Sequence, residues 1–157
     1  MSLRKFFSFF FVVNAVLSRT NAYGIAVSIT VGLNASIDLT VSENDTAIAL
    51  RSGEVPVLGT PRLASLFEEA SVAAISDHLE PGYTSVGMRI HLDHFAPSGV
   101  GTKISATAEV QEVDGRRITF RAQAKCVDNC EENETVIGSA IIIRVLVNTE
   151  RFLERVD

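Results

Sequence analysis

Two neighbouring segments with alternating apolar side chains, joined by an Asp-Gly pair, constrain the fold more than any other feature of the sequence. Residues 103–113 and 116–126 each carry an apolar or small side chain at every second position. This period of two is typical of a strand with one buried face, and Asp114-Gly115 between the segments favours a tight hairpin. The sequence therefore predicts an antiparallel sheet that contains this hairpin. The side chains expected to face the core are Ile104, Ala106, Ala108, Val110, Ile118, Phe120, Ala122 and Ala124.

Three further segments have the composition of strands. Residues 35–42 and 84–95 alternate in the same way, whereas residues 135–148 form a nearly continuous apolar run. A continuous run indicates a central strand that is covered on both faces. Together with the hairpin, these segments predict a sheet of five strands. From the two alternating segments, the side chains expected to face the core are Ile37, Leu39 and Val41, and Val86, Met88, Ile90 and Leu92.

One helix interrupts the strands. Thr60 suits the N-cap position and Pro61 the first helical residue, and Pro81-Gly82 ends the unit shortly after His78. The order of one strand, one helix and four strands predicts an α+β fold in which one long helix packs on an antiparallel five-stranded sheet. Since one helix covers only one face of a sheet, we expect a partner chain, as a homodimer or a dimer of dimers. The apolar positions at helical spacing are Leu63, Leu66, Phe67, Ala70 and Ala74.

The beginning of the chain differs in character from the rest. Arg4 and Lys5 precede an apolar stretch from Phe6 to Leu17, and small or polar residues follow, which is the layout of a cleavable signal peptide. The stretch is shorter than the roughly 20 residues of a spanning helix, so we expect no stable membrane span in the mature chain. The expected organisation is a leader over residues 1–22, a linker over 23–32 and one domain over 33–157.

The destination of the chain has alternatives at this stage. The first acidic residue is Asp38, so an organelle transit peptide fits nearly as well as a secretory signal. An uncleaved anchor would extend toward residues 25–31. A wrongly joined first exon would instead leave the protein in the cytoplasm. We expect the secretory pathway or an organelle.

Charge and cysteine content exclude several classes of site. The formal net charge is −5, so no general positive field draws the chain to nucleic acid, and local basic groups must hold any anionic ligand. Cys126 and Cys130 are the two cysteines, and they lack the further ligands of a structural zinc. We expect no metal and no cofactor. The sequence leaves open whether the two cysteines are bridged.

Two adjacent glutamates differ in their helical surroundings. Glu69 shares a polar face with other hydrophilic residues, whereas Glu68 falls beside small or apolar residues. A carboxylate among apolar groups costs free energy unless it is protonated or paired, and such positions are enriched in functional sites. Glu68 is therefore the candidate site residue, and the alternative is a charge at the helix edge. The polar face holds Arg62, Ser65 and Ser76, and the neighbours of Glu68 are Ala64, Val72 and Ile75.

Three residues on the strands complete the candidates. His94 has the parity of the expected core-facing set, and it is either a structural histidine or a site residue. Gly87 inside a strand indicates a bulge or a close approach to the backbone. Arg144 interrupts the apolar run, so it either extends to solvent at the end of the strand or binds an anion. His78 is expected only to complement the dipole at the end of the helix.

Four segments resemble one known family. VLGTPRLASLFEEA, TSVGMRIHLDH, GTKISATAEVQEVDGRR and IGSAIIIRVLVNTERF are similar to the fluoroacetyl-coenzyme A thioesterase family of hot-dog proteins, in the same order and at consistent spacing over roughly residues 33–156. The resemblance implies a hot-dog fold and hydrolysis of a coenzyme A (CoA) thioester. The segment EVPVLG (54–59) has no Phe to match the aromatic lid of that family. We therefore do not expect specificity for fluoroacetyl-CoA.

The resemblance also implies roles for individual residues. Glu68 matches the active-site glutamate, Thr60 the threonine eight residues earlier, and His94 the histidine seven residues after Gly87. Gly87 matches a glycine that lines the acyl site. Arg144 matches an arginine of a HER-like stretch, although Ile142 and Ile143 replace the polar residues before it, and we expect it to bind substrate.

These roles define the expected chemistry and its alternatives. Glu68 is expected to be the base or the nucleophile, His94 to handle the proton, and Thr60 to position or attack, without a metal. One alternative is a non-catalytic module that binds acyl thioesters and tolerates the loss of Glu68. The other is a hot-dog hydratase, disfavoured because the sequence shows no Asp and His at the spacing of that group.

Overall fold

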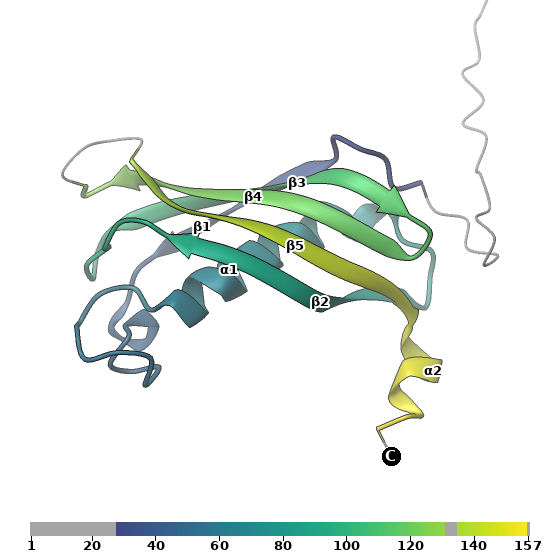
Figure 1. The fold of residues 1–157 in the computed structure, drawn as a ribbon, viewed down its shortest axis with the longest axis horizontal. Helices are drawn as coiled ribbons and strands as arrows, with labels where there is room; N and C mark the ends of the chain where they lie inside the picture. Colours follow the sequence, from purple (N-terminus) through teal and green to yellow (C-terminus); the bar gives the residue numbers. More distant parts are fainter. Residues whose placement is uncertain (1–27, 131–134, 157) are drawn as a thin grey trace, which may run out of the picture.

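A computed structural model describes residues 28–130 and 135–156. It contains one antiparallel sheet with the strand order β1-β3-β4-β5-β2, and the helix α1 lies against one face of this sheet (Figure 1). The expected α+β fold and order of elements are confirmed. The elements are β1 (Asn34–Thr40), α1 (Thr60–Ala73), β2 (Tyr83–His94), β3 (Lys103–Asp114), β4 (Arg117–Asp128), β5 (Val136–Asn148) and α2 (Thr149–Leu153), with short 3-10 helices at Glu43–Asp45 and Ser76–His78.

The core lies between α1 and the inner face of the sheet. All eight core-facing side chains expected on β3 and β4 are buried, as are Leu63, Leu66, Phe67 and Ala70 on α1. Burial of each large apolar side chain contributes about 1.5–3 kcal/mol. The Asp114-Gly115 hairpin is confirmed, with Asp114 paired to Arg117 and Gly115 at a φ of 57°. These positions were predictable because the alternation is local.

A β-bulge changes which residues of β2 face the core. Gly87 pairs with Arg144 but Arg89 pairs with Ile143, so Met88 is an extra residue in β2. Bulges shift the alternation by one position. Consequently Ser85 and Gly87 share the inner face with the later Ile90, Leu92 and His94, whose partners on β5 are inner-face residues. The expected core positions Val86 and Met88 are wrong, and Met88 is 46% exposed.

The outer face of the sheet lacks the cover that we expected for β5. Ile142 and Leu146 are buried beneath α1, but Ile141 on the opposite face is 43% exposed. The prediction of a strand covered on both faces is wrong for the single chain, because α1 covers only the inner face. Four apolar side chains on or near the β2 edge of the sheet are exposed in the single chain. They are Val72, Met88, Ile90 and Ile141.

Both ends of α1 differ from expectation. Gly59 occupies the N-cap position with φ −77° and ψ 140°, and no side chain caps the helix. Thr60 is thus the first helical residue and not the cap, because the chain turns into the helix one residue earlier. The α-helix ends at Ala73, and His78 belongs to the separate 3-10 helix. His78 therefore does not end α1.

The structure also bears on the two cysteines, the start of the domain and the expected leader. Cys126 and Cys130 form a disulfide at the end of β4. Ile29 packs into the core, four residues before the expected start of the domain. The leader expected over residues 1–22 lies outside the described residues. Within the part of the chain that the structure describes, no helix is long and apolar enough to cross a membrane, and no cluster of three or more His, Cys, Asp or Glu side chains could hold a metal ion.

Candidate functional site

Glu68 lies against the backbone of β2 at Gly87. A Cβ atom at Gly87 would overlap Glu68 Oε1, so the absence of a side chain there gives the carboxylate its place. Arg144, the pairing partner of Gly87 on β5, donates from Nη1 to Glu68 Oε1 at 3.3 Å. The expected close approach at Gly87 is thus made by a glutamate of the same chain. We call these two charged residues the Glu68–Arg144 pair.

Ser85 accepts two hydrogen bonds from Arg144 and fixes its side chain. Its Nε donates to Ser85 Oγ and its Nη2 to the Ser85 carbonyl oxygen, both at 2.8 Å. Arg144 is only 5% exposed, so it does not extend to solvent. Burial lowers the pKa of the Arg144 guanidinium, and the nearby Glu68 carboxylate counteracts this effect. The arrangement fixes a cation beside the Glu68 carboxylate.

The sequence did not identify Ser85. Its importance follows from the register of β2 against β5, which sets Ser85 opposite Leu146 and one pleat away from Arg144. A serine next to a strand glycine carries no such signal by itself. Only the bulge and the pairing of two strands about 60 residues apart bring these groups together.

Glu68 and Glu69 differ in their partners and not in their exposure. Their side chains are 44% and 46% exposed in the single chain, so the expected contrast in burial is absent. Glu69 accepts a hydrogen bond from Arg62 Nη1 at 2.9 Å, and Arg62 also pairs with Asp45 at 3.0 Å. Glu69 therefore belongs to a surface ion-pair network, whereas Glu68 meets a buried arginine.

Thr60 and His94 form a second pair at the start of α1. Thr60 Oγ1 lies 3.1 Å from His94 Nδ1. Burial lowers the pKa of His94, although a backbone contact with Ala96 partly opposes this. A neutral imidazole can accept the hydroxyl proton at Nδ1, which then leaves the proton on Nε2. Among the described residues, the buried His94 Nε2 has no hydrogen-bond partner.

The two pairs are separated within one chain. Thr60 and Glu68 are eight residues apart on α1, which corresponds to about 12 Å along the helix axis. Gly87 and His94 stand near opposite ends of β2, roughly 20 Å apart at the usual rise of a strand. The structure therefore brings Thr60 to His94, and Glu68 to Gly87 and Arg144, but it does not bring the two pairs together.

Each pair opens into a cavity. An open cavity of about 600 Å³ lies between α1 and β2 at the Glu68–Arg144 pair, with Val72 and Val86 in its lining. A second cavity of about 370 Å³ lies at Thr60 and His94 and is lined by Val55, Val57, Leu58 and Phe95. Sequence reasoning missed Phe95, which directly follows His94. Apolar cavities with a few polar groups suit an organic substrate with one reactive centre.

Comparison with known proteins agrees with this geometry. The sequence profile of the family "FlK: Fluoroacetyl-CoA-specific thioesterase" matches residues 41–150. The fluoroacetyl-CoA thioesterase of Streptantibioticus cattleyicolor is 35% identical over 100 residues, which are 64% of this chain and 68% of that protein.

Solved structures give the same result at the level of the fold. The fluoroacetyl-CoA thioesterase FlK, solved with fluoroacetate, superposes with a TM-score of 0.73 at 30% identity, covering 82% of this chain and 96% of that chain. A thioesterase-superfamily member from Thermus thermophilus has a TM-score of 0.72 at 21% identity, covering 82% and 93%. The fold, the family match and the two pairs of polar residues lead to one conclusion: this chain belongs to the fluoroacetyl-CoA-specific thioesterase family and is a hot-dog thioester hydrolase.

Proposed function

We propose that this protein hydrolyses acyl-CoA thioesters as a homodimer, without a metal, and that each active site combines Glu68 of one subunit with Thr60 and His94 of the other. The observation that carries the proposal is the separation of the two pairs. Neither pair alone supplies a hydroxyl, a proton carrier and a carboxylate. His94 Nε2 is buried and has no hydrogen-bond partner among the described residues, so it is the imidazole nitrogen left for a further partner once Nδ1 contacts Thr60.

The edge strand β2 supports a two-fold arrangement. In the described part of the chain, β2 pairs on its β5 side alone. Unpaired strand edges that carry apolar side chains favour pairing with another strand. The midpoint of residues 87 and 94 lies between Ile90 and His91. Antiparallel self-pairing about that point sets Gly87 opposite His94 of the partner subunit. It also places the exposed Met88 and Ile90 beside the partner's strand.

This arrangement supplies a complete proton path. Glu68 accepts a hydrogen bond from Nε2–H of the partner's His94, and the Nδ1 atom of that histidine accepts the proton of its own Thr60. The activated Thr60 oxygen, or a water that it positions, attacks the thioester carbonyl carbon. His94 then returns the proton to the leaving sulfur. If Thr60 attacks, a water that His94 deprotonates then cleaves the acyl-Thr60 ester, which releases the carboxylic acid and restores the threonine hydroxyl. Arg144 acts as a positioning residue, because its hydrogen bond holds the Glu68 carboxylate in place.

The lining of the site supports a general acyl specificity. Val55, Val57 and Leu58 form an aliphatic wall beside Thr60 and His94, and Phe95 also lines this cavity. Residues 54–59, where the family has its aromatic lid, contain no aromatic side chain. An aliphatic wall accepts an alkyl chain and offers no special contact to fluorine. The proposed substrates are therefore acyl-CoA thioesters in general, without specificity for fluoroacetyl-CoA.

A matched pair of variants tests the catalytic assignment. Glu68→Gln should lower kcat for acyl-CoA hydrolysis by roughly 10²-fold or more, the usual effect of removing a general base. Glu69→Gln removes an adjacent carboxylate of equal exposure and should leave kcat unchanged. Equal kcat values for the wild type and Glu68→Gln across a panel of acyl chains would contradict the assignment. A wild type that binds acyl-CoA but hydrolyses none would instead be a binding module.

Subunit mixing tests whether the site is shared. Glu68→Gln and His94→Asn proteins should each be inactive as homodimers. After mixing and subunit exchange, half of the dimers are mixed, and each holds one intact site, so about a quarter of the wild-type activity should return. If Glu68 and His94 acted within one subunit, no intact site would form. Sedimentation that detects only monomer would contradict the dimer itself.

We further propose that residues 1–22 direct the chain to the secretory pathway or an organelle. The disulfide between Cys126 and Cys130 supports an oxidising compartment. Mass spectrometry of the native protein should find an N-terminus near residue 23. Abundant peptides that span residues 21–25 would contradict cleavage there.

A further inference from the structure

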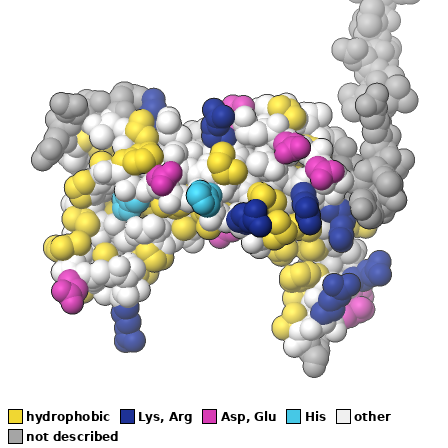
Figure 2. Space-filling model, viewed as in Figure 1, with side chains coloured by type: hydrophobic (Ala, Val, Ile, Leu, Met, Phe, Trp, Pro, Cys, Tyr) yellow, Lys and Arg dark blue, Asp and Glu magenta, His cyan; other side chains and the backbone are white. Residues whose placement is uncertain are grey.

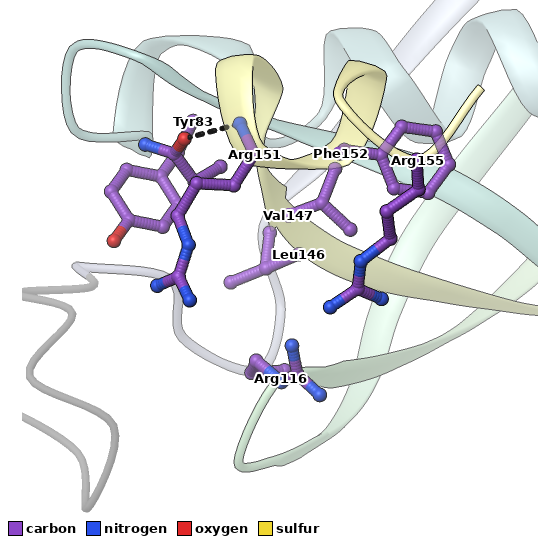
Figure 3. Close-up of a pocket in the computed structure, with 8 residues that line it drawn as sticks. Tyr83, Arg116, Leu146, Val147, Arg151, Phe152 and Arg155 are labelled. Atoms are coloured by element: carbon purple, nitrogen blue, oxygen red, sulfur yellow. Dashed lines mark hydrogen bonds between the residues drawn. The ribbon is translucent and has the colours of Figure 1, made fainter. Parts of the chain in front are cut away.

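A further cavity lies at the end of the sheet where α2 begins. It has a volume of about 210 Å³ and is formed by the start of β2, the end of β5 and α2 (Figure 3). Its lining is unusual in a chain of net charge −5, because it contains three arginines and no acidic side chain. The arginines are Arg116, Arg151 and Arg155. We call it the arginine cavity.

The arginines come from two separate parts of the chain. Arg116 lies in the β3–β4 turn, and Arg151 and Arg155 are four residues apart in and just after α2. In Figure 3 the side chains of Arg151 and Arg155 extend from α2 toward Arg116. The space-filling view shows Lys and Arg side chains gathered over this end of the molecule (Figure 2). Two elements thus direct positive charge to one opening.

The charges of Arg151 and Arg155 are available to a ligand. Within the described ranges, neither guanidinium lies within 4.0 Å of a carboxylate, whereas Arg62 and Arg144 both do. Asn148 caps α2 by accepting from the backbone N–H of Arg151 at 3.1 Å. This contact fixes the backbone and leaves the Arg151 side chain for other partners. A guanidinium group binds a phosphate through two parallel N–H···O hydrogen bonds.

The rest of the lining suits the neutral part of a ligand. Tyr83 and Phe152 contribute aromatic rings at the rim, and Leu146 is buried beneath them. Aromatic rings beside arginines are a common setting for a nucleobase next to phosphate groups. A phosphorylated nucleoside therefore matches the arginine cavity better than an inorganic anion, which would use only the charges.

The arginine cavity and the cavity of the Glu68–Arg144 pair lie along the same two strands. Tyr83 precedes Gly87 by four residues on β2, and Leu146 follows Arg144 by two on β5. The distance from Gly87 to Tyr83 is about 13 Å along the strand. A CoA thioester has its reacting carbonyl at one end of an extended pantetheine arm and its phosphates and adenosine at the other. The two cavities have this order and a comparable spacing.

We propose that the arginine cavity binds the phosphorylated adenosine end of CoA while the thioester lies at Gly87. This inference rests on the proposed function for the identity of the substrate. Arg151 and Arg155 pair with the phosphates, and Tyr83 and Phe152 contact the nucleoside. The cavity thereby distinguishes a CoA thioester from the same acyl group on a short thiol carrier.

Kinetics with two carriers test the inference in the purified full chain. The double variant Arg151→Gln with Arg155→Gln should raise KM for acyl-CoA about tenfold or more and leave kcat unchanged. Its hydrolysis of the matching acyl-N-acetylcysteamine thioester, which has no phosphate, should equal that of the wild type. Arg121→Gln, an exposed arginine on β4, is the matched control and should change neither value. An unchanged KM for acyl-CoA in the double variant overturns the inference.

A binding measurement separates this inference from the proposed function. Titration calorimetry with adenosine 3′,5′-bisphosphate, which has no thiol or acyl group, should show binding to the wild type and to Arg121→Gln. Affinity should fall at least tenfold in the double variant, with an unchanged melting temperature. If the protein hydrolyses no thioester and this pattern still holds, the function fails and the nucleotide site stands. Equal affinity in the wild type and the double variant, or no binding by the wild type, rejects the site.

Discussion

The substitution Gly87→Ala isolates the position of the Glu68 carboxylate from its charge. The added Cβ would overlap Glu68 Oε1 and lie 4.0 Å from Arg144 Nη1. Because the overlapping atom is the end of a flexible side chain, Glu68 can rotate away while the backbone stays in place. Gly87 has no left-handed φ, and alanine is preferred to glycine in strand interiors by roughly 0.5–1 kcal/mol. The variant should therefore fold with a melting temperature close to that of the wild type.

Its activity should fall sharply. The displaced carboxylate loses the 3.3 Å hydrogen bond from Arg144 and, in the proposed dimer, its contact with the partner's His94. Misplacement of a catalytic group by about 1 Å can cost roughly 10²-fold in rate, which corresponds to about 2.7 kcal/mol of transition-state stabilisation. We therefore expect kcat for acyl-CoA hydrolysis to fall about 10²-fold, as it should in Glu68→Gln.

Two other glycines calibrate this result. Gly99→Ala adds a methyl group in open space and should preserve both activity and melting temperature. Gly138→Ala would place a Cβ 2.7 Å from the backbone oxygen of Asp93 and 2.9 Å from Leu63, so it should lower the melting temperature. Melting curves and kcat are measured together for all three. A Gly87→Ala protein that is as active as the wild type would refute the role of the Glu68 position.

Three further outcomes are expected. Thr60→Ala should reduce kcat but change the free energy of unfolding by no more than about 0.5 kcal/mol, because Gly59 and not Thr60 occupies the N-cap position. A larger change in the free energy of unfolding, measured by chemical denaturation, would contradict this. Burial lowers the pKa of His94 below its ordinary 6.5, whereas a carboxylate from the partner would raise it. Glu68→Gln should therefore lower the His94 pKa in an NMR titration, and equal pKa values in the variant and the wild type would show that Glu68 does not reach His94. Cys130→Ser should lower the free energy of unfolding by about 2 kcal/mol, the value for a short disulfide loop, and dithiothreitol should lower the melting temperature of the wild type but not of the variant.

Much of the fold was predictable because its signals are local. The alternation in β3 and β4 and the Asp-Gly turn between them depend on neighbouring residues alone, and the structure confirms them. The prediction for β2 failed before the bulge, at Val86, and at the bulge residue Met88. Ile90, Leu92 and His94 lie after the bulge and keep one parity, so His94 was placed on the correct face. Val86 lies before it and was therefore assigned to the wrong face.

The less predictable features depend on contacts between distant segments. The hydrogen bond from Arg144 to Glu68 joins residues 76 apart in the chain, and the role of Ser85 follows from strand register. Helical periodicity correctly predicted that the side chains of Glu68 and Glu69 point in different directions. It could not supply the buried cation that distinguishes them, nor show that their exposures are nearly equal in one chain.

The equal exposure of the two glutamates agrees with a site that is completed by assembly. In the single chain, the site residues Gly87 and His94 and the exposed Met88 and Ile90 lie along the same strand, β2. Gly87 and His94 are equally distant from the midpoint of residues 90 and 91, where Ile90 is exposed. A two-fold contact there would bury the apolar side chains, shield Glu68 and give His94 Nε2 a partner. The same contact that stabilises the dimer would thus assemble the active site, which would couple hydrolysis to the oligomeric state.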